Sequence, residues 1–298
     1  MIRYRIEFIL FQIFKWLVLA LPLKSAQRLG FYIGSLGFYL SPGRRRVAIE
    51  NLHLAFPDKS DEECISIARG SFRNFGISFI ELLWFPNLND KILRKLIKPH
   101  NLELLNNRFS EGKGLVVLSG HFGNWELIAL GMSYFSKIPF TIIIQKQNNI
   151  FVDEVINQHR CLFGNKVVPM GLSVREIIKT LQNGGIVAIA PDQSGDKDHG
   201  IYIEFFGSIV ATHQGPAVFA LRSGAPLLIG YMIRQHDGTY DVYLEEIQTK
   251  DLTGSTEENI RELTRRHLGK LEQHIRQHPD HWLWMHRRWK HTLKNVEP

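Results

Sequence analysis

The chain has 298 residues, 44% of them hydrophobic and 22% charged, which excludes a disordered or low-complexity chain and provides for one substantial core. Its net charge of +7 favours an anionic partner, such as a nucleic acid, an acidic membrane surface or a phosphorylated substrate. The two cysteines, Cys64 and Cys161, are too far apart for a disulfide framework or a cysteine-rich zinc site, and they fit a reducing compartment.

The first 24 residues predict a membrane-anchoring helix. The segment is apolar and aromatic from Ile6 to Leu23, although Glu7, Gln12 and Lys15 interrupt it. Its length is about that needed to span a bilayer, but the internal charges and the flanking basic residues fit a helix lying in the interface equally well. A buried helix of the main domain is the alternative. We therefore expect an anchor or interfacial helix over residues 1–24 and one further domain over residues 25–298.

Two helical stretches follow. The glycine-rich aromatic residues 25–41 predict a closely packed helix that Pro42-Gly43 ends. The basic cluster at residues 44–46 fits either a solvated surface or contact with an anionic membrane. Residues 60–100 carry apolar side chains at three- and four-residue spacing, which is typical of helices.

From residue 114 onward the pattern alternates between strands and helices. This alternation predicts an α/β domain with a mostly parallel central sheet flanked by helices. Several strands are almost entirely apolar, as expected of strands covered on both faces. The predicted strands cover residues 115–119, 140–144, 166–170, 186–191, 226–233 and 240–247, and the predicted helices cover 124–135, 152–163, 174–183, 215–224 and about 257–278.

His121 and Glu126 are the candidate catalytic residues. His121 ends the strand in "LVVLSGHFGNWE", and ligands gather at the carboxyl ends of parallel strands. On one continuous helix, side chains five residues apart would lie about 140° apart. If His121 instead lies in the turn before the helix, Glu126 can reach back to its ring and fix the tautomer. The other ring nitrogen would then be free to act as a general base.

The motif "HFGNWE" after a strand resembles the lysophospholipid acyltransferase superfamily. The closer resemblance is to its bacterial branch of lipid A late acyltransferases of the lauroyl/myristoyl type, which has Glu where the broad superfamily has Asp. The other segments that carry this resemblance appear in the family's order: Asn51–Glu63, Ala190–Gln193, Phe205–Gly207, Ala211–Pro226 and Trp282–Lys290.

The resemblance implies a reaction and a place for it. A fatty acyl chain would move from acyl carrier protein to a hydroxyl of a lipid A precursor, at the cytoplasmic face of the bacterial inner membrane. The fold would be glycerolipid acyltransferase-like, with residues 25–298 as the acyltransferase domain. His121 would deprotonate the hydroxyl with support from Glu126, and attack on the thioester would be direct, without a cofactor. The absence of a Gly-x-Ser-x-Gly motif agrees with this route.

Several residues are candidates for substrate binding. Asp192 ends a predicted strand at the same edge of the sheet as His121 and is expected to bind or orient the acceptor. Lys146 stands where the family often has an arginine, and Asn149 is nearby. Arg222 is either a phosphate contact or a structural residue. Gly207, Thr212 and Gly215 lie in a loop that resembles the family's third block, although its Glu-Gly-Thr-Arg sequence is missing here.

Three alternatives remain open at this stage. The acceptor can be another glycolipid, an aminolipid or a lysophospholipid. A hydrolase would use His121, Glu126 and Asp192 to hold a metal that activates water. A basic membrane-bound interaction protein with a vestigial site is the non-enzyme alternative.

The last 17 residues combine tryptophan with arginine and lysine, a mixture that nucleic-acid-binding and membrane-interface segments share. Given the resemblance, we expect this segment to pack near the mouth of the site or to contact the membrane, with no nucleic-acid partner. The sequence leaves open the length of the acyl chain, the choice between acyl carrier protein and coenzyme A, and the oligomeric state.

Overall fold

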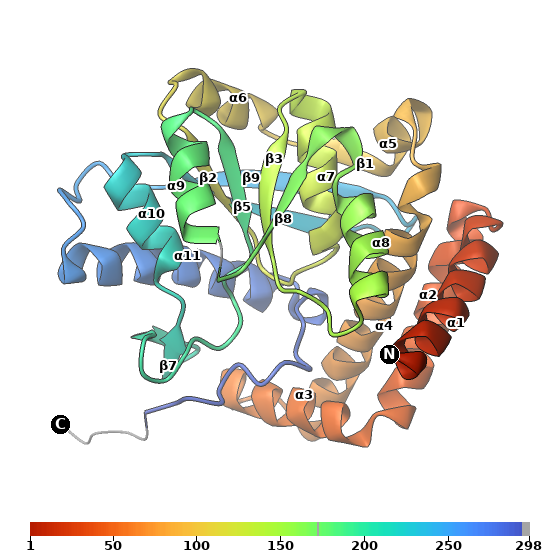
Figure 1. Cartoon of the computed structure of the whole chain (residues 1–298). Coiled ribbons are helices and arrows are strands. Elements are labelled where there is room, and N and C mark those ends of the chain that lie inside the picture. The colour runs from red at the N-terminus through yellow and green to blue at the C-terminus, as the bar shows by residue number, and fades with distance from the viewer. Residues whose placement is uncertain (172, 294–298) are drawn as a thin grey trace.

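A seven-stranded sheet forms the centre of the computed structural model, which describes residues 1–171 and 173–293 (Figure 1). The strand order is β1-β9-β8-β2-β5-β3-β4, and β8, β2, β5, β3 and β4 run parallel. Strand β9 pairs antiparallel with β8, and β1 pairs parallel with β9, so these two strands run opposite to the other five. The strand bounds are β1 Ile97–Pro99, β2 Leu115–Leu118, β3 Phe140–Ile144, β4 Lys166–Pro169, β5 Ile186–Ile189, β8 Leu227–Arg234 and β9 Tyr240–Ile247. The predicted mostly parallel sheet is therefore confirmed.

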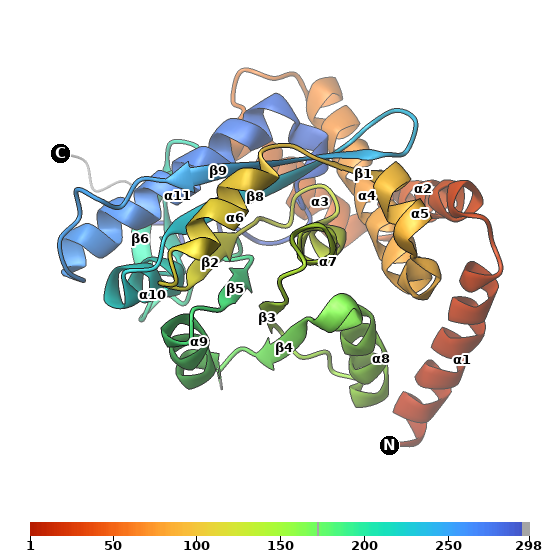
Figure 2. The same cartoon turned by 90° about the horizontal axis from the view of Figure 1, so that it is seen from above.

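Helices cover both faces of this sheet (Figure 2). One face packs against α5 (Asp90–Leu96), α6 (Leu102–Ser110), α7 (Trp125–Ser136) and α8 (Ile150–Arg160). The other face packs against α9 (Ser173–Gln182), α10 (Gly215–Ser223) and α11 (Glu257–Gln277). In β2, Leu115 and Val117 join the first core while Val116 and Leu118 join the second, so the whole strand is buried. That burial explains its unbroken apolar sequence.

The N-terminal third is helical: α1 (Ile2–Leu19), α2 (Leu23–Leu40), α3 (Pro42–Ala55) and α4 (Asp61–Trp84). Pro42 does stop the preceding helix, but it also begins α3, because a proline is tolerated in the first turn of a helix. Helices α2 and α4 approach closely through glycines. A Cβ atom on Gly34 would lie 2.2 Å from the carbonyl oxygen of Phe72. Three short 3-10 helices cover Phe85–Asn87, Leu162–Gly164 and Pro279–His281.

A two-stranded hairpin outside the main sheet was not expected from the sequence. It joins β6 (Ile201–Phe205) to β7 (Ser208–Thr212). The turn uses Phe206 and Gly207, both with positive φ, of which only the glycine adopts that conformation without strain. Residues read as a loop therefore form an ordered element.

Helix α1 confirms the expected N-terminal helix. Within residues 1–171 and 173–293, no helix is both long and apolar enough to cross a bilayer, so a membrane-spanning segment at residues 1–24 is not supported. The end of α1 is tied to α4 and the residues after it. The indole N–H of Trp84 donates to the carbonyl of Leu21 over 2.8 Å, and the amide of Asn87 donates to the carbonyl of Leu19 over 2.9 Å.

Candidate active site

The candidate site lies where the chain changes direction within the sheet. From β2 the chain moves outward through α7, β3 and α8 to β4, and then returns through α9 to β5, between β2 and β3. Strands β3 and β5 pair only from Phe140 to Ile142. The helices that follow them lie on opposite faces, α8 on one and α10 on the other. Such a switch point leaves a crevice at the carboxyl ends of the strands.

A cavity of about 590 Å³ occupies this crevice. Its lining is mainly aliphatic and aromatic, with a smaller set of polar side chains that includes His121, Gln193 and His213. Trp125, Ala129 and Met132 of α7 line one wall at helical spacing, so the cavity extends from the catalytic motif along this helix. The arrangement suits a ligand that has one polar end and a long apolar part.

Asp192 lies directly against His121 at the mouth of this cavity. The Nδ1 atom of His121 is 2.7 Å from Oδ1 of Asp192, and the backbone N–H of His121 donates to Oδ2 over 2.8 Å. The indole N–H of Trp282 also donates to Oδ2, over 2.8 Å. Asp192 is only 3% exposed, so three N–H groups satisfy a buried carboxylate. This pairing fixes the ring with Nδ1 as donor and leaves Nε2 as the basic nitrogen.

The electrostatics of the pair follow from this geometry. Burial acts to lower the pKa of His121, but the charge and hydrogen bond of Asp192 outweigh it and raise that pKa above its ordinary value. Burial likewise acts to raise the pKa of Asp192, yet His121 and the other donors lower it to about 2. Asp192 is therefore ionised at neutral pH and stabilises a proton on the ring.

The free edge of the ring faces the cavity. The side chain of His121 is 20% exposed, and its Nε2 atom lies 3.2 Å from the side-chain amide nitrogen of Gln193. The amide donates to the lone pair of Nε2, which is the position that a substrate hydroxyl would take. The predicted role of His121 as a base that opens onto a ligand site is therefore geometrically possible.

Glu126 does not form the expected hydrogen bond with His121. Its two oxygens instead accept from the guanidinium of Arg160, over 2.6 and 2.8 Å. Asn124 caps α7 by accepting the backbone N–H of Leu127, so the helix begins at once and turns Glu126 toward α8. Both Glu126 and Arg160 line the cavity. The contact predicted for Glu126 belongs to Asp192, and Glu126 acts on the His121 pKa only as a nearby charge.

Lys146 and Asn149, which are close in the sequence, have different surroundings in the structure. Lys146 is exposed after β3, between Gln145 and Gln147, which line the cavity. Asn149 is buried outside the cavity lining. It caps α8 and donates to the carbonyl of Tyr4 in α1 over 2.9 Å. The geometry therefore keeps Lys146 near the mouth, whereas it offers no support for substrate contact by Asn149.

The third-block candidates also occupy different places. Gly215 begins α10 and lines the cavity. Thr212 is buried, and its hydroxyl accepts from the guanidinium of Arg288 over 2.6 Å, which makes it a support for the loop. Gly207 lies at the exposed tip of the β6–β7 hairpin, and Arg222 is exposed in the last turn of α10. Neither of these two lines the cavity.

Three functional positions were missed from the sequence. Gln193 follows Asp192 directly and lies on the reacting edge of His121. Trp282, expected to pack near the mouth or to contact the membrane, donates its indole N–H to Asp192. Arg160 neutralises Glu126. A signal existed for Gln193 and Trp282, because they lie in the segments Ala190–Gln193 and Trp282–Lys290 that carried the resemblance, but there was none for Arg160.

Comparison with known proteins places the whole chain in one family. The family model described as bacterial lipid A biosynthesis acyltransferase matches residues 1–291. The lipid A biosynthesis palmitoleoyltransferase of Escherichia coli (strain K12) is 30% identical over 92% of this chain and 88% of its own length. The lauroyltransferase of the same organism is 25% identical over 94% and 90%. A phosphatidylinositol mannoside acyltransferase of Mycobacterium tuberculosis (strain CDC 1551 / Oshkosh) is 23% identical over 74% and 69%. The chain belongs to the bacterial lipid A biosynthesis acyltransferase family.

Proposed function

We propose that this protein transfers a fatty acyl chain from acyl carrier protein to a hydroxyl of a lipid A precursor, with His121 as the general base. The observation that carries the proposal is the Asp192-bound His121, whose free nitrogen opens onto a long apolar cavity. Family membership supports the acyl transfer itself. No cofactor enters the proposed reaction.

The reaction proceeds by direct attack. The Nε2 atom of His121 removes the proton of the acceptor hydroxyl as its oxygen bonds to the thioester carbonyl carbon. Asp192 stabilises the imidazolium formed in this step. The tetrahedral intermediate then collapses with cleavage of the carbon–sulfur bond, and the imidazolium returns its proton to the departing thiolate. The products are the acyl ester and the free thiol of the carrier.

The oxyanion of the intermediate needs hydrogen-bond donors. At the start of α7 the N–H groups of Leu127 and Ile128 are already bonded to Asn124, which leaves those of Trp125 and Glu126 as possible donors. The side-chain amide of Gln193 is the donor nearest the base, because it lines the cavity and lies 3.2 Å from Nε2 of His121. The acceptor hydroxyl takes its place at Nε2, and the NH₂ group can then donate to the oxyanion. We assign it to the oxyanion.

The acyl chain fits the apolar part of the cavity along α7. Its thioester end would lie beside His121 and Trp125, and its methyl end would lie toward Met132 and Phe140. The positive net charge of +7 suits an acidic acyl carrier protein and a phosphorylated acceptor, but it does not separate that donor from coenzyme A, which is also anionic. A comparison of acyl carrier protein with coenzyme A as the donor tests this choice.

Membrane contact follows from exposed apolar side chains on the first two helices. The exposed residues on α1 recur at helical spacing and form one stripe, and basic residues flank them. Such a helix lies in the bilayer interface, which suits action at the cytoplasmic face of the inner membrane. The large apolar side chains that are more than half exposed are Ile2, Ile6, Ile9, Leu10, Ile13, Trp16 and Leu17 in α1, and Tyr32, Leu36, Tyr39 and Leu40 in α2.

Mass spectrometry of lipid A tests the proposal. Lipid A from a strain lacking the gene should be one acyl chain short, and the wild-type gene should restore the chain while a gene encoding His121→Ala should not. In vitro, His121→Ala should lower turnover by about 10²–10⁴-fold, the usual contribution of a general base. Unchanged lipid A, with a change in another glycolipid, would instead favour the alternative suggested by the phosphatidylinositol mannoside acyltransferase match.

A metal-dependent hydrolase would need a different arrangement of these side chains. It requires His121, Glu126 and Asp192 to converge on one ion, but Glu126 is directed to Arg160. Release of free fatty acid without transfer to any acceptor, dependent on added metal, would support the hydrolase and contradict the transferase.

A further inference from the structure

The turn that carries His121 rests on a buried polar stripe of α4. Ser71, Asn74, Ser78 and Glu81 follow one another at spacings of three, four and three residues, so they share one face of the helix. All four are less than 9% exposed. A buried helix face is normally apolar, so these four side chains need polar partners.

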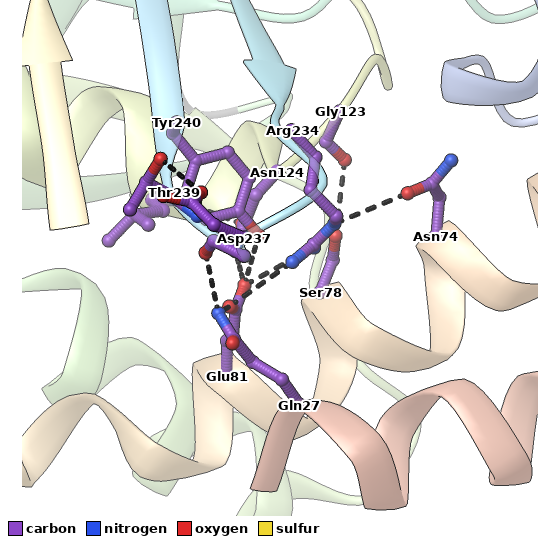
Figure 3. Close-up of polar contacts among 12 residues, drawn as sticks. Gln27, Asn74, Ser78, Glu81, Gly123, Asn124, Arg234, Asp237, Thr239 and Tyr240 are labelled. Carbon is purple, nitrogen blue, oxygen red and sulfur yellow. Dashed lines mark hydrogen bonds and ion pairs between the residues drawn. The ribbon is translucent and has the colours of Figure 1, made fainter. Parts of the chain in front are cut away.

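Two of these side chains bond to the segments next to the His121–Asp192 pair. Ser71 donates to the carbonyl of Trp282 over 2.5 Å, and Trp282 in turn holds Asp192. Ser78 donates to the carbonyl of Gly123 over 3.1 Å, two residues after His121 (Figure 3). One face of α4 thus supports both the carboxylate and the base.

Glu81 is the most heavily bonded member of the stripe (Figure 3). It is 2% exposed, and its Oε2 atom accepts from the amide of Asn124 over 2.6 Å and from the hydroxyl of Tyr240 over 2.5 Å. The guanidinium of Arg234 donates to both oxygens, over 3.3 and 3.4 Å, and the amide of Gln27 donates to Oε1 over 2.7 Å.

The turn from His121 to Asn124 is closely packed against its neighbours. Gly123 has φ of +59°, and a Cβ atom there would lie 1.8 Å from the carbonyl oxygen of Met232. Its N–H donates to the carbonyl of His281. At one end of the turn His121 is fastened to Asp192, and at the other end Asn124 is fastened to Glu81. The two attachments together set the position of the imidazole relative to its carboxylate.

We propose that Glu81 is a positioning residue, which acts through Asn124 to hold the His121 turn in register with Asp192. A buried ion pair such as Arg234–Glu81 generally adds little net stability, because desolvation offsets much of its attraction. The role of this ion pair is to fix a position. It holds the carboxylate of Glu81 opposite the side-chain amide of Asn124, the residue that ends the turn. The inference rests on the proposed function for its kinetic consequence but not for its structural one.

The decisive measurement is the titration of His121 by NMR, which needs no substrate. The charged and titratable groups that act on its ring are Asp192, Glu126 of α7, Arg160 of α8 and His286 of the C-terminal segment. None of them is altered by Glu81→Gln. If the turn shifts and the contact with Asp192 loosens, the pKa of His121 should fall toward or below its ordinary value. The signal is assigned by its loss in His121→Ala.

A double variant that exchanges the carboxylate and the amide, Glu81→Gln/Asn124→Asp, separates a positioning role from a general loss of stability. We call it the exchange variant. Glu81→Gln should lower the pKa of His121 and reduce kcat by about 10–10²-fold, because misplacement by about 1 Å can cost that much. Combining it with Asn124→Asp restores a hydrogen bond between positions 81 and 124, keeps the total charge and retains a good helix cap. The double variant should therefore regain most of the wild-type titration and rate.

Tyr240→Phe is the matched control. It removes another donor from the same oxygen of Glu81, but from β9 and not from the catalytic turn. It should lower the melting temperature and leave the titration of His121 in place. Ser78→Ala removes a bond to the turn without any change of charge, and should lower the pKa of His121 in the same direction as Glu81→Gln.

Two outcomes would overturn the inference. One is an unchanged pKa of His121 in both Glu81→Gln and Ser78→Ala. The other is a folded exchange variant that keeps the lowered pKa. If Glu81→Gln fails to fold, the exchange variant and Ser78→Ala still decide the matter. The variants could show the expected changes in the pKa of His121 while the wild-type protein has no acyltransferase activity. That result would refute the proposed function and leave the positioning role intact.

Discussion

Both oxygens of Asp192 have assigned donors: Oδ1 faces Nδ1 of His121, and Oδ2 accepts the backbone N–H of His121 and the indole N–H of Trp282. Asp192→Asn should therefore do more than remove a charge. The two N–H donors fix the new amide oxygen at the Oδ2 position, so the NH₂ group faces Nδ1 and drives the ring proton to Nε2. A ring protonated there cannot act as the base. We expect kcat to fall by about 10²–10⁴-fold, with substrate KM values nearly unchanged, in steady-state assays.

The pH dependence of the rate checks the same pair. The base must be neutral, so the rate should rise with pH through the pKa of His121, which Asp192 raises above the ordinary 6.5 against the effect of burial. Removal of the carboxylate leaves burial as the largest remaining effect on the pKa of His121, so the acid limb of Asp192→Asn should move to lower pH. An acid limb at the same pH in both proteins would contradict the assignment of Asp192 as the partner of the base.

The ion pair between Glu126 and Arg160 predicts an effect on stability. The two side chains are 13% and 12% exposed, and removal of one partner leaves a largely buried charge. Glu126→Ala should lower the free energy of unfolding by about 3–5 kcal/mol, measured by urea denaturation. The double variant Glu126→Leu/Arg160→Leu should recover much of that loss, because neither charge is then left unpaired. Equal losses in the single and double variants would mean that the ion pair is not the cause.

The sequence predicted the arrangement of the strands better than the side-chain pairs. Most strands of the main sheet from residue 115 onward are rich in apolar residues, and local composition is enough to identify them, whereas the β6–β7 hairpin was missed. Asp192 could be placed near His121 because both follow parallel strands that end at one edge of the sheet. The partner of Glu126 was predicted wrongly as His121, because its actual partner Arg160 lies 34 residues away on another helix. Spacing along the chain carries no information about such a contact.

The polar stripe on α4 shows the same limit. Its apolar residues predict a helix, and the helix is present. The serine, asparagine and glutamate between them resemble an ordinary solvated face in the sequence. Only the tertiary structure reveals that this face is covered by the catalytic turn and the C-terminal segment.

The cavity along α7 predicts how acyl length is selected. Seven residues separate Trp125 from Met132, which is about 10 Å along the helix axis. Ala129 lies between them on the same wall. Ala129→Leu should obstruct the cavity and shift the preferred acyl chain to a shorter one, while Met132→Ala should extend it and favour a longer one. Competition between acyl donors of several lengths measures the shift. Ala129→Ser, which adds little volume, should keep the wild-type preference, and unchanged preferences in all three variants would place the chain elsewhere.

The exposed stripe of α1 predicts how the protein binds membranes. The double variant Leu10→Glu/Leu17→Glu places two charges on this stripe and should weaken co-sedimentation with vesicles that contain phosphatidylglycerol. Ile178→Glu, an equivalent change at an exposed position of α9, should not. The binding that remains should decrease with added salt, because it depends on basic residues and anionic lipid. Equal binding by the two variants would contradict a role for α1.

The position of Lys146 predicts a contact with the acceptor headgroup. Its side chain is exposed after β3, between two residues that line the cavity, whereas Arg222 is exposed in the last turn of α10 and lies outside the lining. A hydrogen bond between a charged group and a phosphate contributes roughly 1.5–3 kcal/mol. Lys146→Met should therefore raise the apparent KM for a phosphorylated acceptor about ten-fold or somewhat more, with a smaller effect on the acyl donor. Lys146→Arg should retain much of the activity because the charge remains, and Arg222→Met should have little effect. If Lys146→Met impairs phosphorylated and dephosphorylated acceptors equally, Lys146 does not bind the phosphate.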